Sequence, residues 1–155
     1  MVKAVTEPKE KAKIAAKILL DLPAWFGIPE ATKTYIDDSQ TMPFFAYDLN
    51  QEAVGFISLK ETSKYTVEIY CMGVLKAYHR KGFGKALIAA AEHYAVNQGY
   101  HLIQVKTVES GHYDIYDHTA QFYRTSGFKD FEVFKTLWDK HNPCQVLIKC
   151  LKHHQ

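Results

Sequence analysis

The chain has 155 residues, of which 47% are hydrophobic and 23% charged, a balance typical of a globular domain and not of a disordered chain. Its 19 basic and 17 acidic residues give a net charge of +2, and no long Lys/Arg run marks a nucleic-acid surface. No apolar stretch approaches the roughly 20 residues of a membrane span, and three cysteines without a close pair argue against a disulfide framework, so we expect one cytosolic domain over residues 1–155.

Two helices are predicted first. Apolar residues recur at helical spacing over residues 12–22, after the cap-and-proline sequence Thr6-Glu7-Pro8. Trp25-Phe26-Gly27 then predicts an apolar loop, and Pro29 begins a second helix that we expect to end at about Asp38. Aromatic residues in such a loop can contact a ligand, although packing is the commoner role.

Short runs rich in Phe, Val, Ile and Tyr follow and predict strands at residues 44–48, 53–60 and 65–74. Polar turns at residues 49–52 and 61–64 separate them. We therefore expect three consecutive antiparallel strands.

In the second half, an amphipathic helix is predicted at residues 84–98, with Gly99 as its left-handed stop. The remaining predicted elements are a strand at 101–108, a short helix at 119–126 before Gly127, and strands at 128–134 and 144–151. A strand, a helix and a strand in succession favour a parallel pairing in this half.

Residues 74–86 join a predicted strand to a predicted helix through a glycine-bearing loop. Backbone N–H groups converge at such a junction and the helix dipole adds partial positive charge, so a phosphate or pyrophosphate is well held there. Gly82 and Gly84 let the backbone approach a ligand. Further donors around the same point come from the side chains of His79, Arg80, Lys81 and Lys85.

Two other nucleotide-binding loops do not fit this segment. A Walker loop needs G-x-x-x-x-G-K-[ST], but one residue separates the two glycines and Ala86 follows Lys85. A dinucleotide fingerprint needs a third glycine where the chain has Leu87. The glycine pair alone is equally compatible with a turn that merely shapes the start of a helix.

The loop resembles the coenzyme A loop of the GCN5-related N-acetyltransferase (GNAT) superfamily, whose pattern is [Q/R]-x-x-G-x-[G/A] after the fourth strand. Here it reads His79-Arg80-Lys81-Gly82-Phe83-Gly84, with His79 in place of Gln or Arg. Residues 120–128 resemble a second motif of the superfamily, F-Y-x-x-x-G-F, and the element order is similar over nearly the whole chain. The resemblance implies an α+β fold with a mixed sheet of six or seven strands, helices on both faces, and coenzyme A in a cleft between the fourth and fifth strands.

Acyl transfer from a thioester to an amine needs a base, donors for the developing oxyanion, and a proton for the departing thiolate. Glu68 resembles the base of the histone-modifying branch, and its neighbours Val67 and Ile69 would desolvate it. A solvent-facing or salt-bridged glutamate fits the pattern as well. For the oxyanion the resemblance implies the N–H groups of Met72, Gly73 and Val74, which with residues 79–85 complete the expected cofactor contacts.

The resemblance also implies that Tyr123 is the general acid, and a role in packing the short helix is compatible with that one. Many members carry an asparagine seven residues earlier, where this chain has Tyr116, so no contact is transferred to that position. Cys71 has no base placed beside it, and we reject it as a nucleophile.

The expected function is transfer of an acetyl group from acetyl-coenzyme A to a primary amine by direct attack, with a small-molecule acceptor. Protein or peptide amino groups as acceptors, and a non-catalytic acyl-coenzyme-A-binding module, remain alternatives. Homodimer formation is left open. No metal is expected, because the spacing of His112, Asp114, Asp117 and His118 matches no ligand pattern. The acceptor is expected to be flanked by Trp25, Phe26, Tyr113 and Tyr116.

Overall fold

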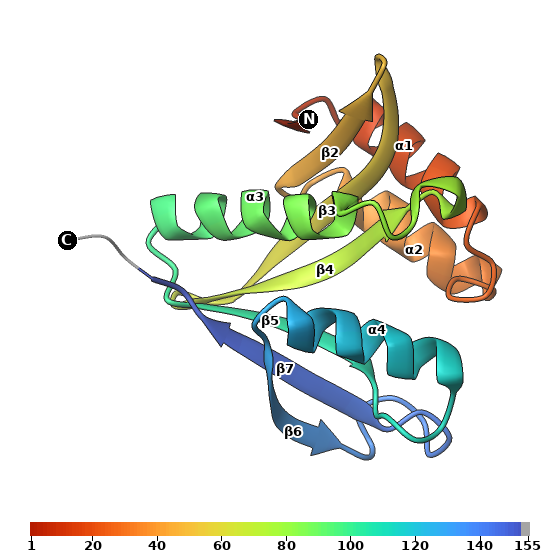
Figure 1. The fold of residues 1–155 in the computed structure, drawn as a ribbon, viewed down its shortest axis with the longest axis vertical. Helices are drawn as coiled ribbons and strands as arrows, with labels where there is room; N and C mark the ends of the chain where they lie inside the picture. The colour runs from red at the N-terminus through yellow and green to blue at the C-terminus, as the bar shows by residue number, and fades with distance from the viewer. Residues whose placement is uncertain (153–155) are drawn as a thin grey trace. The chain divides into compact units, whose positions relative to one another are not determined.

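A computed structural model describes residues 1–152 of the chain (Figure 1). Within these residues the helices are α1 (Pro8–Leu20), α2 (Pro29–Ser39), the short 3-10 helix η1 (Lys76–Tyr78), α3 (Phe83–Asn97) and α4 (Asp114–Thr125). The strands are β1 (Val2–Ala4), β2 (Phe44–Leu49), β3 (Glu52–Ser63), β4 (Thr66–Val74), β5 (Leu102–Val108), β6 (Lys129–Phe134) and β7 (Cys144–Cys150).

The strands form one mixed seven-stranded sheet in the order β1-β2-β3-β4-β5-β7-β6, which confirms the predicted mixed sheet. The parallel pair is β4 with β5, in a register that runs from Thr66 opposite Leu102 to Ile69 opposite Val105. Strand β7 pairs antiparallel with both β5 and β6, so β5 and β6 are not neighbours although only a helix separates them in sequence. The parallel crossover is therefore made through α3 and not through α4.

The chain divides into two compact units, which we describe separately. Unit 1 comprises Met1–Lys60 and Tyr70–Tyr94, and unit 2 comprises Glu61–Ile69 and the described residues from Ala95 onward. Strand β4 contributes its first residues to unit 2 and its last to unit 1.

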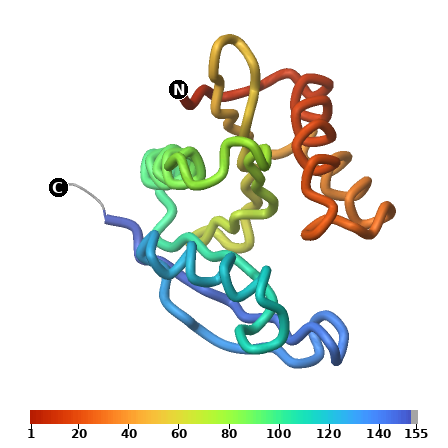
Figure 2. Tube along the Cα trace, turned by 45° about the vertical axis from the view of Figure 1, so that its right-hand side comes forward, coloured from red at the N-terminus to blue at the C-terminus, as the bar shows by residue number. Residues whose placement is uncertain are grey.

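In unit 1, helices α1 and α3 cover opposite faces of the strands, as both views show (Figures 1 and 2). Two glycines allow this close approach. A Cβ at Gly73 would lie 3.0 Å from side-chain atoms of Ile18 and Leu22, and a Cβ at Gly55 would lie 3.1 Å from Leu87 of α3. Larger residues at these positions would push the helices away from the sheet.

The core of unit 1 follows from the predicted helical spacing. Ile18 and Leu19 of α1 are fully buried against Phe44 and Phe56, whose rings stack at 5.1 Å. Pro8 occupies the first turn of α1 as predicted, whereas the N-cap residue makes no side-chain capping bond. The second helix also begins at the expected residue, Pro29.

Unit 2 differs from the sequence-based expectation in its helix. Helix α4 begins at Asp114, five residues before the predicted start at Thr119, so Asp117 and His118 are helical and not part of a loop. The N–H of Gly111 donates to Asp117 Oδ1 at 2.9 Å, and Asp114 and Asp117 carry negative charge in the first turn, which the helix dipole favours. These polar residues therefore start the helix.

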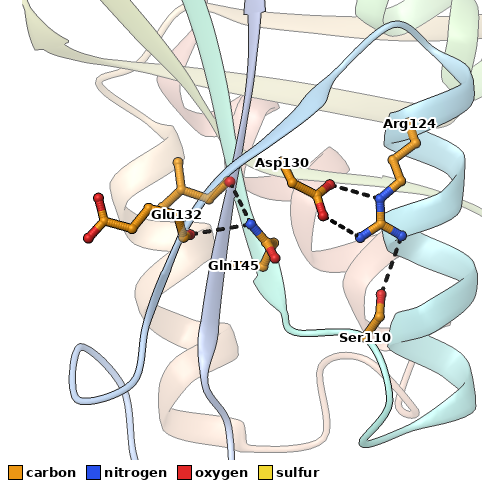
Figure 3. Close-up of polar contacts among 6 residues, drawn as sticks. Ser110, Arg124, Asp130, Glu132 and Gln145 are labelled. Atoms are coloured by element: carbon orange, nitrogen blue, oxygen red, sulfur yellow. Dashed lines mark hydrogen bonds and ion pairs between the residues drawn. The ribbon is translucent and has the colours of Figure 1, made fainter.

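Side-chain bonds tie α4 and β7 to the edge strand β6 (Figure 3). Arg124 donates to both carboxylate oxygens of Asp130, at 2.8 and 3.0 Å, and to Ser110 Oγ at 3.3 Å. The Gln145 amide donates to the carbonyl oxygen of Glu132 at 3.3 Å. The β6–β7 register shifts between Asp130 and Glu132, so these bonds hold the strand on either side of the irregularity.

Two further details differ from the prediction. Strand β1, which pairs with β2, is too short to show a periodicity and was not expected. Strand β3 extends to Ser63, so the polar residues 61–63, predicted as a turn, lie in the strand. No helix among residues 1–152 has both the length and the apolar character needed to cross a membrane.

Candidate functional site

The predicted phosphate loop lies in unit 1 between β4 and α3. Gly82 has φ +82°, a left-handed conformation that favours glycine, and a Cβ built on it would meet no atom within 4 Å. The first bond of α3 runs from Ala86 N–H to Gly82 O at 3.1 Å. The N–H groups of Phe83, Gly84 and Lys85 thus belong to the first turn, where a helix offers no carbonyl acceptor and an anion can bind.

Aromatic stacking fixes the start of α3. The Phe83 ring stacks on Tyr47 of β2, with centroids 4.0 Å apart and planes at 17°, and also lies 6.0 Å from the Tyr78 ring of η1. Phe83 therefore contributes its backbone to the loop, while its side chain anchors the helix to the sheet.

The charged side chains of the loop point into solvent. Arg80, Lys81 and Lys85 are exposed, and Arg80 has φ +62°, an uncommon conformation for a residue with a side chain. Left-handed residues at 80 and 82 alternate around Lys81, the kind of backbone that forms an anion-binding concavity. The loop thus combines partial charges of the backbone with full charges of three side chains.

His79 is engaged with the protein itself. Its Nε2 atom lies 2.7 Å from the carbonyl oxygen of Val74, and its ring meets the Trp25 ring edge to face at 5.9 Å. The contact with a carbonyl acceptor requires a proton on Nε2, so this atom donates within the chain. His79 ties the loop to the end of β4.

The end of β4, the predicted oxyanion site, is held by two further bonds. Leu75 N–H donates to Val54 O at 2.8 Å, and Lys76 N–H donates to the Asp21 carboxylate at 2.8 Å. With the His79 contact, these bonds fix the chain directly after Met72, Gly73 and Val74. Gly73 also lies against α1, as described above.

Glu68 lies in unit 2 and is 6% exposed. Its Oε1 atom accepts a hydrogen bond from Gln104 at 2.9 Å and lies 3.1 Å from Lys106 Nζ. Glu68 is therefore buried, as expected of a desolvated base. It is also salt-bridged, as in the alternative interpretation of this residue. Both contacts use Oε1.

Tyr123, also in unit 2, is 6% exposed on α4. Its ring packs edge to face against Phe122 at 5.4 Å and against Phe128 at 5.7 Å. Gly127, with φ +97°, ends the helix and lets Phe128 N–H donate back to the Tyr123 carbonyl. The motif Phe-Tyr-x-x-x-Gly-Phe thus describes one packed turn.

The chain matches a model of the acetyltransferase (GNAT) family over residues 15–128. It belongs to this family. The prediction of an acetyl-coenzyme-A-dependent GNAT acetyltransferase is thereby confirmed at the level of the family.

Solved GNAT structures share the fold at low sequence identity. A GNAT-family protein from Desulfovibrio desulfuricans is 16% identical, with a TM-score of 0.81 over 98% of this chain and 99% of that one. The aminoglycoside 6'-N-acetyltransferase from Enterococcus faecium is 17% identical, with a TM-score of 0.77 over 100% and 99%. A GNAT acetyltransferase from Elizabethkingia anophelis, solved with acetyl-coenzyme A bound, is 19% identical, with a TM-score of 0.72 over 97% of both chains.

The four aromatic residues expected to flank the acceptor of this GNAT protein fall into two pairs. Trp25 and Phe26 lie in unit 1 and pack on its core. In unit 2, Tyr113 is the N-cap residue of α4 and its ring lies edge to face with Tyr116 at 5.8 Å. Burial, with a smaller contribution from Tyr113, raises the pKa of Tyr116.

The structure also describes the thiol that we rejected as a nucleophile and the residues considered for a metal site. Cys71 is buried in the core of unit 1, where desolvation raises the pKa of its thiol, so the thiol stays neutral and a poor nucleophile. Within residues 1–152, no group of three or more His, Cys, Asp or Glu side chains could hold a metal ion.

Sequence reasoning missed several side chains around these positions. The partners of Glu68 are Gln104 and Lys106, which are two positions apart on the predicted strand at 101–108. Because residues two apart share one face of a strand, this spacing could have placed both side chains together. Asp38 and Tyr70 form a hydrogen bond across 32 positions of sequence, which no local pattern could show.

Proposed function

We propose that this GNAT protein transfers the acetyl group of acetyl-coenzyme A to a primary amine of a small molecule by direct attack, and that the two units act as one catalytic domain. The observation that carries the proposal is the junction of β4 and α3. There a left-handed glycine, the first turn of a helix and three exposed cationic side chains coincide, as pyrophosphate binding requires.

In this proposal the loop holds the pyrophosphate and the end of β4 holds the thioester. The N–H groups of Met72, Gly73 and Val74 would stabilise the oxyanion that forms when the amine attacks the carbonyl carbon. The rigid hydrogen bonds of His79 and Asp21 after this segment support such a role, because donors held in place need no reorganisation during the reaction.

Glu68 and Tyr123 take the proton-transfer roles. Glu68 accepts the proton of the attacking amine, directly or through water, at its Oε2 atom, while Gln104 and Lys106 hold Oε1. Collapse of the tetrahedral intermediate breaks the carbon–sulfur bond, and Tyr123 gives its phenolic proton to the thiolate, whose basicity is comparable to that of a phenol. The products are the acetamide and free coenzyme A.

The fold is shared with the aminoglycoside 6'-N-acetyltransferase from Enterococcus faecium and also with Ard1 from Thermoplasma volcanium, so our proposal of a small-molecule acceptor depends on partly exposed aromatic residues as well. The aromatic residues Trp25 and Phe26 are only partly buried, so they can cover an acceptor with apolar or planar groups.

The test is a screen of acetyl-coenzyme A turnover, read as free thiol, against small monoamines, diamines, aminoglycosides and lysine-containing peptides. We expect thiol release above the rate without amine for a small amine, with the acetylated product identified by mass. Faster turnover of peptides would replace the small acceptor by a protein one. Binding of acetyl-coenzyme A without turnover of any amine would identify a binding module, and no affinity for coenzyme A would refute the proposal.

A further inference from the structure

A carboxylate lies among aromatic rings where α2 meets β4 in unit 1. Tyr70 Oη donates a hydrogen bond to Asp38 Oδ2 at 2.5 Å, and both residues are partly buried. The Tyr35 ring stands edge to face against Tyr70 at 5.4 Å, and Phe26 against Tyr35 at 5.8 Å. We call Asp38 and Tyr70 the α2–β4 pair. Neither residue has a role in the steps described above.

Among residues 1–152, the carboxylate of this pair has no cationic partner in an ion pair. Asp37, its neighbour on α2, forms an ion pair with Lys33 at 3.1 Å. Asp38, in contrast, forms no ion pair with any side chain of residues 1–152, and its Oδ1 atom accepts no hydrogen bond there. Burial and the bond to Asp38 raise the pKa of Tyr70, so the phenol remains a neutral donor. A carboxylate has acceptor sites on both oxygens, so Oδ1 can still accept a bond from a charged donor.

The aromatic face of the pair already attracts an ammonium group. Lys60 Nζ lies 5.9 Å from the centroid of the Tyr70 ring, within the range of a cation–π contact. Lys60 is exposed, and its long side chain can leave when another cation arrives. The pair thus offers an incoming ammonium the two groups that bind one in proteins, a carboxylate oxygen and the face of a phenol ring.

Tyr70 precedes Met72 by two positions on the same strand. At a rise of about 3.3 Å per residue, the Cα atoms of Tyr70 and Met72, the first proposed oxyanion donor, are roughly 7 Å apart along β4. We propose that the α2–β4 pair binds a second, non-reacting ammonium of the acceptor, so that the enzyme prefers diamines whose amino groups are separated by about this length. This inference rests on the proposed function, because the oxyanion position comes from it.

The first experiment compares 1,4-diaminobutane, which spans about this separation when extended, with n-butylamine as the matched monoamine and 1,2-diaminoethane as a diamine too short to bridge. In the unsubstituted protein, kcat/KM is expected to be at least about tenfold higher for 1,4-diaminobutane than for n-butylamine, the size of one charge-assisted bond. The shorter diamine should behave like the monoamine. Equal kcat/KM for all three amines would overturn the inference.

Asp38→Asn removes the charge and keeps the shape, and Asp37→Asn is its matched control one position away. We expect Asp38→Asn to lose the tenfold preference, with kcat/KM for n-butylamine and KM for acetyl-coenzyme A unchanged within about twofold. Asp37→Asn should keep the preference. Equal losses on both amines in Asp38→Asn, or the same loss in Asp37→Asn, would contradict a specific ammonium site.

Tyr70→Phe provides a second route if Asp38→Asn does not fold, since it removes only the phenol oxygen and keeps the ring. It should lower the preference for the diamine, because Asp38 loses the bond that orients it; an unchanged preference would count against the pair.

Calorimetry of 1,4-diaminobutane with the coenzyme-A-saturated protein separates the two proposals. Diamine binding that is lost in Asp38→Asn supports the pair even if no amine is acetylated, in which case the proposed function alone fails. Turnover of monoamines without any diamine preference refutes the ammonium site at the α2–β4 pair and leaves the proposed function standing.

Discussion

Unit 1 presents its candidate pyrophosphate and oxyanion contacts mainly from the backbone, whereas unit 2 presents its candidate proton-transfer groups from side chains. In unit 1 the left-handed Gly82 and the first turn of α3 form the loop, and the Tyr47–Phe83 stack holds it. In unit 2 the carboxylate of Glu68 and the ring of Tyr123 are each held by other side chains. A backbone site tolerates most changes of side chain, while a side-chain site depends on every partner.

This difference between backbone and side-chain groups should be visible in the kinetics. The backbone donors of the Gly82 loop bind a ligand in its ground state and should govern affinity for coenzyme A, whereas the proton-transfer groups act in the transition state and should govern kcat. Substitutions in the Gly82 loop and at the proton-transfer residues of unit 2 are therefore expected to change different kinetic parameters.

The largest effect is expected from Tyr123→Phe in unit 2. Loss of the general acid should lower kcat by about 10²-fold or more, while the ring contacts with Phe122 and Phe128 remain and KM for acetyl-coenzyme A changes little. Steady-state thiol release measures it. Tyr65→Phe, at a 51% exposed position of the same unit, is the control and should keep full activity. A kcat within threefold of the parent would remove Tyr123 from the mechanism.

Gly82→Ala and Gly127→Ala compare two left-handed glycines, one in each unit. A residue with a Cβ costs about 1–2 kcal/mol in this conformation, although nothing within 4 Å would clash with it at Gly82. The free loop of Gly82→Ala relieves this strain by leaving the left-handed conformation, which coenzyme A binding must then restore, so binding should weaken about tenfold by calorimetry. Gly127→Ala should lower the melting temperature and leave that affinity unchanged. If both variants lost affinity equally, the assignment of the phosphate site to unit 1 would be wrong.

His79→Ala tests how a side chain supports the end of β4 in unit 1. It removes the bond to the Val74 carbonyl and the contact with Trp25, so KM should rise about two- to tenfold. The rise should be the same for acetyl-coenzyme A and for acetylpantetheine, which lacks the pyrophosphate. A rise for acetyl-coenzyme A alone would instead show that His79 acts on the pyrophosphate loop and not on the end of β4.

The same contrast explains what could be predicted from sequence. The glycine loop and α3 could be read locally, because Gly82, Gly99 and Gly127 occupy the left-handed positions that glycine favours, and the three φ values are +82°, +87° and +97°. The order of the strands beyond β5 could not be predicted locally, because β7 lies next to β5 through pairing of residues about 40 positions apart in sequence.

The start of α4 was missed for a different physical reason. His112, Asp114 and Asp117 are polar, and polar clusters predict loops by composition, but acidic residues are also favoured in the first turn of a helix. Likewise, the apolar neighbours of Glu68 left burial and a solvent-facing or salt-bridged position equally open, and its pairing with Lys106 depended on the parallel register of β4 and β5.

The smallest effects are expected for Arg124→Lys and for its comparison in unit 1, which together test whether side-chain pairing also stabilises unit 2 outside the site. Lysine keeps the charge but cannot bond to both oxygens of Asp130 as arginine does at 2.8 and 3.0 Å, so unfolding free energy should fall by about 0.5–1 kcal/mol. Urea titration measures this loss, and 1 M salt should reduce the difference because Asp130 is half exposed. In unit 1, Lys33→Gln breaks the ion pair of Lys33 with Asp37, in which both side chains are more exposed, and should cost only about 0.3 kcal/mol. If the two losses were equal, the Arg124–Asp130 pair would be an ordinary surface contact, and the reliance of unit 2 on paired side chains would be confined to Glu68 and Tyr123.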